Sequence, residues 1–142
     1  MTAQTVSDLL AGRTLRGIGG SFTVAAACHR MREHGIGALA VLDDGKLVGI
    51  LSERDIAVRV IAGHRDPMLT LVREVMTRRP RTIPAHEPIP AALRAMMHGG
   101  FRHLPVLSDG EPVRMLSLRD IPAAYRTEGG PSRHGSIIPA LG

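Results

Sequence analysis

The chain has 142 residues, only 2% of them aromatic, and it carries a formal net charge of +5 and a single cysteine, Cys28. This length predicts one globular domain or two small halves with a shared core, and one cysteine excludes an internal disulfide and any metal site built from several cysteines. The positive charge favours an anionic partner, but the aromatic residues are too few and scattered to stack nucleic-acid bases, so we favour a small phosphorylated ligand.

The ends of the chain carry no sign of export or membrane insertion. The first residues lack the apolar core of a signal peptide, and no stretch approaches the roughly 18 apolar residues of a membrane span. We therefore expect a soluble cytoplasmic chain with no membrane partner. Residues 1–5 and the Gly- and Pro-rich residues 127–142 are expected to be flexible.

The first half of the chain predicts a helix, a hairpin and a second helix. Val24, Ala27, Cys28 and Met31 follow the spacing of an amphipathic helix, which is expected to end at Gly35. Residues 38–42 and 47–51 then read as two strands joined by an Asp-Gly turn at 44–45. Ser52, with Asp55 three residues later, predicts the start of the next helix. Residues 62–70 are expected to form a connector, and residues 71–76 a lead-in helix.

The second half repeats these elements. Residues 24–56 and 89–121 align without a gap, 65 positions apart, and 15 of the 33 paired positions are identical. Each copy has an apolar face too large for one such unit to cover, so the two copies are expected to pack on each other. The sequence thus predicts an α/β fold of two units, at 6–66 and 71–126.

The strand-to-helix corner at the end of each copy is the main candidate for a binding site. Such a corner presents backbone N–H groups to a phosphate, Ser52 and Arg54 add side-chain donors, and Asp55 can accept hydrogen bonds from both hydroxyls of a ribose. The alternative is that Ser52 and Asp55 merely cap the helix. Capping requires no arginine, yet both copies carry one in register, Arg54 and Arg119, which favours ligand contact.

The ordered phrases of both copies resemble the cystathionine beta-synthase (CBS) domain pair, also called a Bateman module. They are Gly-Ile-Gly-Ala-Leu at 35–39, Gly-Ile-Leu-Ser-Glu-Arg-Asp at 49–55, Glu-Val-Met-Thr at 74–77 and Arg-His-Leu-Pro-Val at 102–106. The resemblance covers about residues 6–126. It implies tandem helix-strand-strand-helix units, each with a short lead-in strand, packed about a pseudo-twofold axis, and a homodimer that regulates an unidentified protein. It also implies an adenosyl ligand, such as AMP, ATP, NAD(H) or S-adenosylmethionine, bound between the repeats.

In the family's pattern, each corner works with the lead-in segment and first strand of the other copy, which gives two clefts. The first, which we expect to be the main site, combines Ser52, Arg54, Asp55, Thr77, Pro80, Arg102, His103 and Leu104. The second combines Leu15, Gly37, Ala38, Leu39, Ser117, Arg119 and Asp120. Two departures are expected to weaken the second cleft: Arg114 replaces the glycine found at Gly49, and Pro122 interrupts the helix that follows Ser117.

Other residue patterns give weaker candidates. The seven histidines are dispersed without metal-ligand spacing, Cys28 is expected to be a buried inert thiol, and the basic cluster at 78–81 is either a solvated loop or an attractor of phosphates. We find no nucleophile elbow, phosphate loop or paired carboxylates, and therefore expect no catalytic residues, no metal and no enzyme. Two alternatives stay open: a ligand-free dimerisation scaffold, and a basic nucleic-acid-binding protein, which is less favoured.

Overall fold

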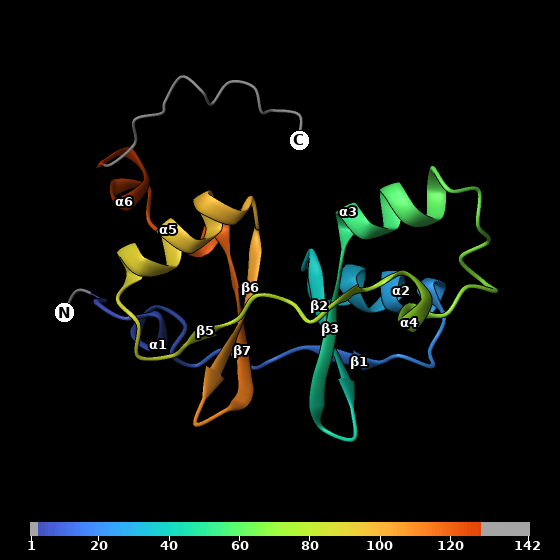
Figure 1. Ribbon diagram of the computed structural model, residues 1–142, viewed down its shortest axis with the longest axis horizontal. Helices are drawn as coiled ribbons and strands as arrows, with labels where there is room; N and C mark the ends of the chain where they lie inside the picture. Colours follow the sequence, from blue (N-terminus) through green and yellow to red (C-terminus); the bar gives the residue numbers. More distant parts are fainter. Residues whose placement is uncertain (1–2, 129–142) are drawn as a thin grey trace.

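Residues 3–128 are described here by a computed structural model, in which two α/β units lie side by side along the long axis (Figure 1). The elements of the first unit are β1 (Gly17–Gly19), α2 (Val24–His34), β2 (Ala38–Asp43), β3 (Lys46–Ser52), α3 (Glu53–Asp55) and the π-helix η1 (Ile56–Ile61). Those of the second are β5 (Ile83–Pro84), α5 (Ile89–Gly99), β6 (His103–Ser108), β7 (Glu111–Ser117), the 3₁₀ turn η2 (Leu118–Asp120) and α6 (Ala123–Glu128). Two short helices, α1 (Val6–Leu9) and α4 (Val72–Val75), and strand β4 (Thr77–Arg78) complete the fold. The predicted tandem α/β architecture is confirmed.

Helices α2 and α5 form where the apolar spacing predicts them. In α2 the buried residues include Val24 and Met31, and a threonine side chain caps its start by accepting a hydrogen bond from the N–H of Ala26. The two helices end at Gly35 and Gly100, which adopt left-handed φ values of 63° and 72°. Glycine adopts this conformation without steric cost, so both helix ends are set by the sequence.

Each unit contains the predicted hairpin. At its tip, Asp44 and Asp109 both have a φ of 52°, and each is followed by a glycine of positive φ, as an Asp-Gly turn requires. Strands β2 and β3 pair antiparallel, as do β6 and β7, while β1 and β5 add in parallel to β2 and β6. The sheet orders are β1-β2-β3-β4 and β5-β6-β7.

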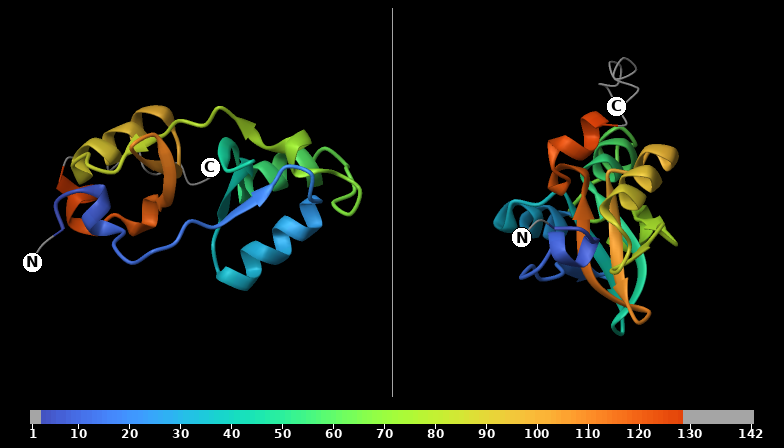
Figure 2. Two further views of the ribbon diagram at one scale, coloured as in Figure 1. Left: turned by 90° about the horizontal axis from the view of Figure 1, so that it is seen from below. Right: turned by 90° about the vertical axis from the view of Figure 1, so that its left-hand side faces the viewer.

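The two lead-in helices are exchanged between the units. Helix α1 precedes the first unit but buries Val6 in the core of the second, whereas α4 precedes the second unit but buries Val72 in the core of the first. The anchoring hydrogen bonds match: the N–H of Val6 donates to the Glu87 carbonyl and that of Val72 to the Phe22 carbonyl, each at 2.9 Å. Residues 71–76 thus contain the expected helix, but it completes the other unit's core. The connecting segments 10–16 and 79–82 consequently cross between the units on opposite sides (Figure 2).

A glycine-to-arginine difference between β3 and β7 accompanies the unequal sheets. A Cβ on Gly49 would lie 2.9 Å from the Thr77 carbonyl oxygen, so the glycine lets β4 approach and pair with β3. At the equivalent position of β7, the Nε of Arg114 donates to the Leu10 carbonyl at 3.0 Å. Arg114 therefore binds the end of α1, and within residues 3–128 no strand pairs with β7 on that side.

The second corner also departs from the first in its helix. After Ser52 the chain runs without interruption through α3 into η1, but after Ser117 the single turn η2 ends at Asp120 and α6 begins only after Pro122. Proline cannot donate the N–H that a continuous helix needs, which agrees with the distortion expected here.

Residues 3–5, which were expected to be flexible, make defined contacts in the structure. Thr5 caps α1, since its Oγ1 accepts a hydrogen bond from the N–H of Asp8 at 3.1 Å, and the Ala3 carbonyl accepts one from the Tyr125 hydroxyl. At the other end, residues 127 and 128 belong to α6. Residues 1–2 and 129–142 of the segments expected to be flexible lie outside the described residues. Among residues 3–128, no helix has the length and apolar character needed to cross a membrane.

Candidate ligand-binding cleft

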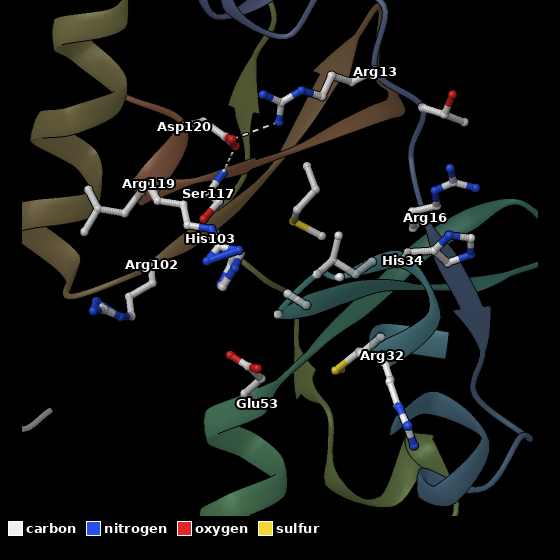
Figure 3. Close-up of a pocket in the computed structure, with 18 of the residues that line it drawn as sticks. Arg13, Arg16, Arg32, His34, Glu53, Arg102, His103, Ser117, Arg119 and Asp120 are labelled. Carbon is white, nitrogen blue, oxygen red and sulfur yellow. Dashed lines mark hydrogen bonds and ion pairs between the residues drawn. The ribbon is translucent and has the colours of Figure 1, made fainter. Parts of the chain in front are cut away.

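A cavity of about 950 Å³ opens between the two units (Figure 3). The first unit contributes the end of α2, the loop into β2 and the start of α3, and the second contributes the start of β6 and the turn η2. The crossing segment at residues 12–16 supplies a further wall. The cavity therefore exists only because the two units pack together.

The lining of this cavity is strongly basic. It contains two carboxylates, Glu53 and Asp120, against six arginines: Arg13, Arg16, Arg32, Arg102, Arg119 and Arg126. A concave surface lined by one sign of charge concentrates ions of the opposite sign. The cavity is thus suited to an anionic ligand with several phosphate oxygens, which arginines bind in pairs of hydrogen bonds.

The corner at Ser117 lies on the cavity wall. The N–H of Ser117 donates to Asp120 Oδ2 at 2.8 Å, and Arg13 Nη1 donates to Asp120 Oδ1, also at 2.8 Å. The Asp120 side chain is 12% exposed and that of Arg13 is 54% exposed. Arg13 therefore covers a carboxylate that otherwise faces the cavity (Figure 3).

Gly37 lies on the cavity wall between Glu53 and His103. A Cβ there would lie 2.8 Å from Glu53 Oε1, the movable end of a side chain, and 3.7 Å from His103 Cε1, an ordinary contact distance. Burial lowers the pKa of His103, and the nearby charge of Glu53 opposes this effect. A neutral imidazole can accept as well as donate a hydrogen bond, which suits contact with the edge of a base.

The corner at Ser52 is closed by its own hydrogen bonds. Asp55 is 7% exposed, its Oδ2 accepts from the N–H and Oγ of Ser52 at 2.8 and 3.0 Å, and its Oδ1 accepts from Thr77 Oγ1 at 3.0 Å. Arg59 lies 3.8 Å from the same carboxylate and donates to the carbonyls of Val75 and Met76. This network ties the exchanged helix α4 to the corner.

The structure divides the predicted site residues among four groups. Five of the second set line the cavity, together with two of the first set: Gly37, Ala38, Ser117, Arg119 and Asp120, with Arg102 and His103. Ser52, Asp55 and Thr77 are brought together at the other corner. Leu39 and Leu104 are 0% exposed in the two cores. Leu15, Arg54 and Pro80 do not line the cavity; Arg54 is exposed and the other two are half-buried.

Sequence reasoning missed the arginines that the crossing segment brings to the cavity. Arg13 and Arg16 stand 65 positions before Arg78 and Arg81, so the repeat extends upstream of the segment in which it was recognised. The same offset pairs Gly12 with Thr77. Gly12 has no hydroxyl, and Asp120 has Arg13 as its partner where Asp55 has Thr77.

Two further expectations concern Cys28 and metals. Cys28 is half-buried rather than fully buried and lies on the cavity wall, and burial raises the pKa of its thiol, which lowers the fraction of the reactive thiolate. In the part of the chain from residue 3 to 128, no group of three or more His, Cys, Asp or Glu side chains is placed to hold a metal ion.

Comparison with known proteins matches the chain to one family. The CBS domain model matches residues 14–61 and 72–126. The CBS domain-containing protein CBSCBSPB2 of Arabidopsis thaliana is 39% identical over 116 residues, which is 81% of this chain and 22% of that protein. The chain spans between 17% and 22% of the length of the first curated relatives that it matches.

Solved structures agree with this match. A CBS-domain containing protein from Agrobacterium tumefaciens is 29% identical and superimposes with a TM-score of 0.80, covering 88% of this chain and 95% of that one. A CBS domain protein from Pyrobaculum aerophilum, solved in complex with AMP, shares the fold at a TM-score of 0.77 and 24% identity, covering 87% of this chain and 96% of that one.

Proposed function

This chain belongs to the CBS domain family, and on that premise we propose that it is a regulatory module that binds an adenosyl nucleotide in the cleft between its two units. The observation that carries the proposal is the charge of the cleft. Six arginines against two carboxylates give a formal charge of +4 around a cavity of about 950 Å³, which falls within the usual size of small-molecule sites.

The proposed contacts follow from the chemistry of each wall. Asp120 would accept hydrogen bonds from the ribose hydroxyls, and Arg119 and Arg102 would bind the phosphates. Gly37 and Ala38 offer a small flat surface for the adenine, beside the His103 ring. The positive cleft favours AMP, ATP or NAD(H) over S-adenosylmethionine, whose sulfonium group is itself a cation.

We place the proposed ligand at the Ser117 corner rather than at the Ser52 corner favoured from the sequence. Asp120 lines the cavity, whereas Asp55 is 7% exposed and holds internal hydrogen bonds from Ser52 and Thr77. A ligand at the Ser52 corner would have to break these bonds, and an unpaired buried hydrogen-bonding group costs about 1–3 kcal/mol.

A ligand panel tests the proposal directly. Thermal unfolding of the full chain is followed with AMP, ADP, ATP, NAD(H) and S-adenosylmethionine at saturating concentration, since a ligand that binds only the folded state raises the melting temperature. We expect a rise with the phosphorylated ligands that is reduced by Arg119→Ala and by Asp120→Ala.

Arg78→Ala provides the matched control, because Arg78 stands at the repeat-equivalent position of Arg13 but does not line the cavity. It should leave the ligand-induced rise unchanged. If none of these ligands raises the melting temperature of the wild-type chain, the proposed function is refuted.

Regulation requires that the ligand distinguish two arrangements of the units, because a ligand that binds both arrangements equally shifts neither. We propose that a ligand which contacts both walls of the cleft favours one such arrangement, and that the chain acts as a cytoplasmic homodimer which presents the change to a partner protein. Light scattering and small-angle X-ray scattering with and without AMP measure the oligomeric state and the change in shape.

One observation favours the rival proposal of a ligand-free scaffold. Both corner carboxylates already have internal partners, Thr77 for Asp55 and Arg13 for Asp120. Mass spectrometry of small molecules released from the denatured purified protein separates the two proposals, since a scaffold would release no stoichiometric nucleotide.

A further inference from the structure

The Arg13–Asp120 ion pair stands at the point where the proposed function requires a ribose. Asp120 Oδ2 is occupied by the Ser117 N–H, so Oδ1 is the oxygen whose partner can be exchanged, and Arg13 Nη1 holds it at 2.8 Å. With Arg13 in place, the Asp120 side chain is only 12% exposed. A ribose cannot reach this carboxylate with both hydroxyls until the guanidinium moves.

Arg13 is able to move. Its side chain is 54% exposed, and it belongs to a crossing segment rather than to a helix or strand. An ion pair with one partner this exposed contributes little to stability, so a ribose can displace it at small cost. Arg13 also lines the cavity, which means that the displaced guanidinium stays where the phosphates would lie.

We infer that Arg13 is an exchangeable partner of Asp120 that makes binding depend on both the ribose and the phosphate of the ligand. The inference rests on the proposed function and adds a specificity residue to it. The ribose hydroxyls replace Arg13 on Asp120, and the released guanidinium pairs with a ligand phosphate. A nucleoside without phosphate breaks the ion pair and leaves Arg13 without an anion, so the site discriminates against it.

The other corner shows why this behaviour belongs to the second copy alone. There Oδ1 of the equivalent carboxylate, Asp55, accepts a hydrogen bond from the neutral hydroxyl of Thr77. Arg59, 3.8 Å from the same oxygen, is held by the carbonyls of Val75 and Met76 and does not line the cavity, so it is not released toward a phosphate there. At the position that the repeat pairs with Thr77 the chain carries Gly12, which has no hydroxyl, and Asp120 Oδ1 is bound by Arg13 instead.

Calorimetric titration of the full chain with AMP and with adenosine tests the inference. In Arg13→Gln, AMP should bind about tenfold or more weakly, because a charge-assisted hydrogen bond to phosphate is lost, while adenosine should bind up to about fivefold more tightly, because its competitor is gone. These opposite changes are the signature of exchange. If Arg13 had only a structural role, its substitution would weaken the binding of both ligands.

Arg16→Gln is the matched control, because Arg16 lines the same cavity but makes no ion pair with Asp120. Arg16→Gln should weaken the binding of AMP and leave the affinity for adenosine unchanged. Arg13→Lys keeps the charge but has fewer hydrogen-bond donors, so its affinity for AMP should lie between those of the wild type and Arg13→Gln. It replaces Arg13→Gln in the test if that variant folds poorly. Changes of the same sign for both ligands in Arg13→Gln overturn the inference alone, whereas wild-type protein that binds neither ligand overturns the proposed function and the inference together.

Discussion

The two corner aspartates, although paired by the repeat, are predicted to differ in how much they stabilise the fold. Asp55 is 7% exposed and accepts three hydrogen bonds, two from Ser52 and one from Thr77. Asp55→Ala removes a helix cap and leaves these donors without an acceptor in a mostly buried place, so we expect a loss of about 3 kcal/mol. Asp120 accepts one backbone hydrogen bond and one from the half-exposed Arg13, and Asp120→Ala should cost only about 1–1.5 kcal/mol.

Urea and thermal unfolding of the ligand-free variants measure this difference. For a chain of this size, these losses correspond to falls in melting temperature of about 10 °C for Asp55→Ala and about 4 °C for Asp120→Ala. Asp43→Ala, at an exposed strand end, is the control and should change stability by less than about 0.5 kcal/mol. If Asp120→Ala destabilises the chain as much as Asp55→Ala, the division into a structural corner and a ligand corner is refuted.

Three further predictions concern pH, packing and access to the cleft. Burial lowers the pKa of His103 below its ordinary value of 6.5, so the unfolded chain takes up the proton first and stability should fall as the pH is lowered. In His103→Gln, the free energy of unfolding measured with urea should fall less steeply between about pH 7.5 and about pH 5.5 than in the wild type. An equally steep fall in the variant would show that His103 is not the group responsible. Gly49→Ala should lower the free energy of unfolding by about 1–3 kcal/mol, because the new Cβ would lie 2.6 Å from Met76 Sδ. Gly37→Ala should lower it by less, because the new Cβ there meets only the movable end of a side chain. Equal losses in the two variants would argue against the close approach at Gly49. Cys28 should react slowly with iodoacetamide, and the reaction should be slower still in the presence of saturating AMP. If AMP does not slow the reaction, the nucleotide binds elsewhere.

The local elements were predictable because each depends on residues close together in the sequence. The spacing of Val24 and Met31 specifies α2, and the Asp-Gly pairs specify the hairpin turns. The gapless repeat then predicted two similar units, since a chain that carries the same apolar pattern twice must bury it twice. The distorted helix after Ser117 followed from Pro122 alone.

The exchange of the lead-in helices was not predictable from such local signals. Nothing in residues 71–76 or in α1 indicates which core each segment enters, because both cores are built from apolar side chains of the same kinds. The preference proposed here for the Ser117 corner likewise depends on contacts that local signals do not reveal. Arg114 was expected to weaken the second cleft, but in the structure its Nε donates to the Leu10 carbonyl, a contact between residues far apart in the chain.

The sequence by itself determined the elements, the two-unit fold and the two strand-to-helix corners, because these depend on periodicity, turn residues and caps within a few positions. Only the tertiary structure decided which corner faces a cavity, since that depends on how residues from distant segments meet. Asp55 and Asp120 have nearly the same neighbours in sequence, yet one is closed by Thr77 and the other is covered by an exposed Arg13 beside a basic cleft. Side chains from opposite ends of the chain create that difference in burial and charge, and these are the quantities that govern whether a ligand can bind.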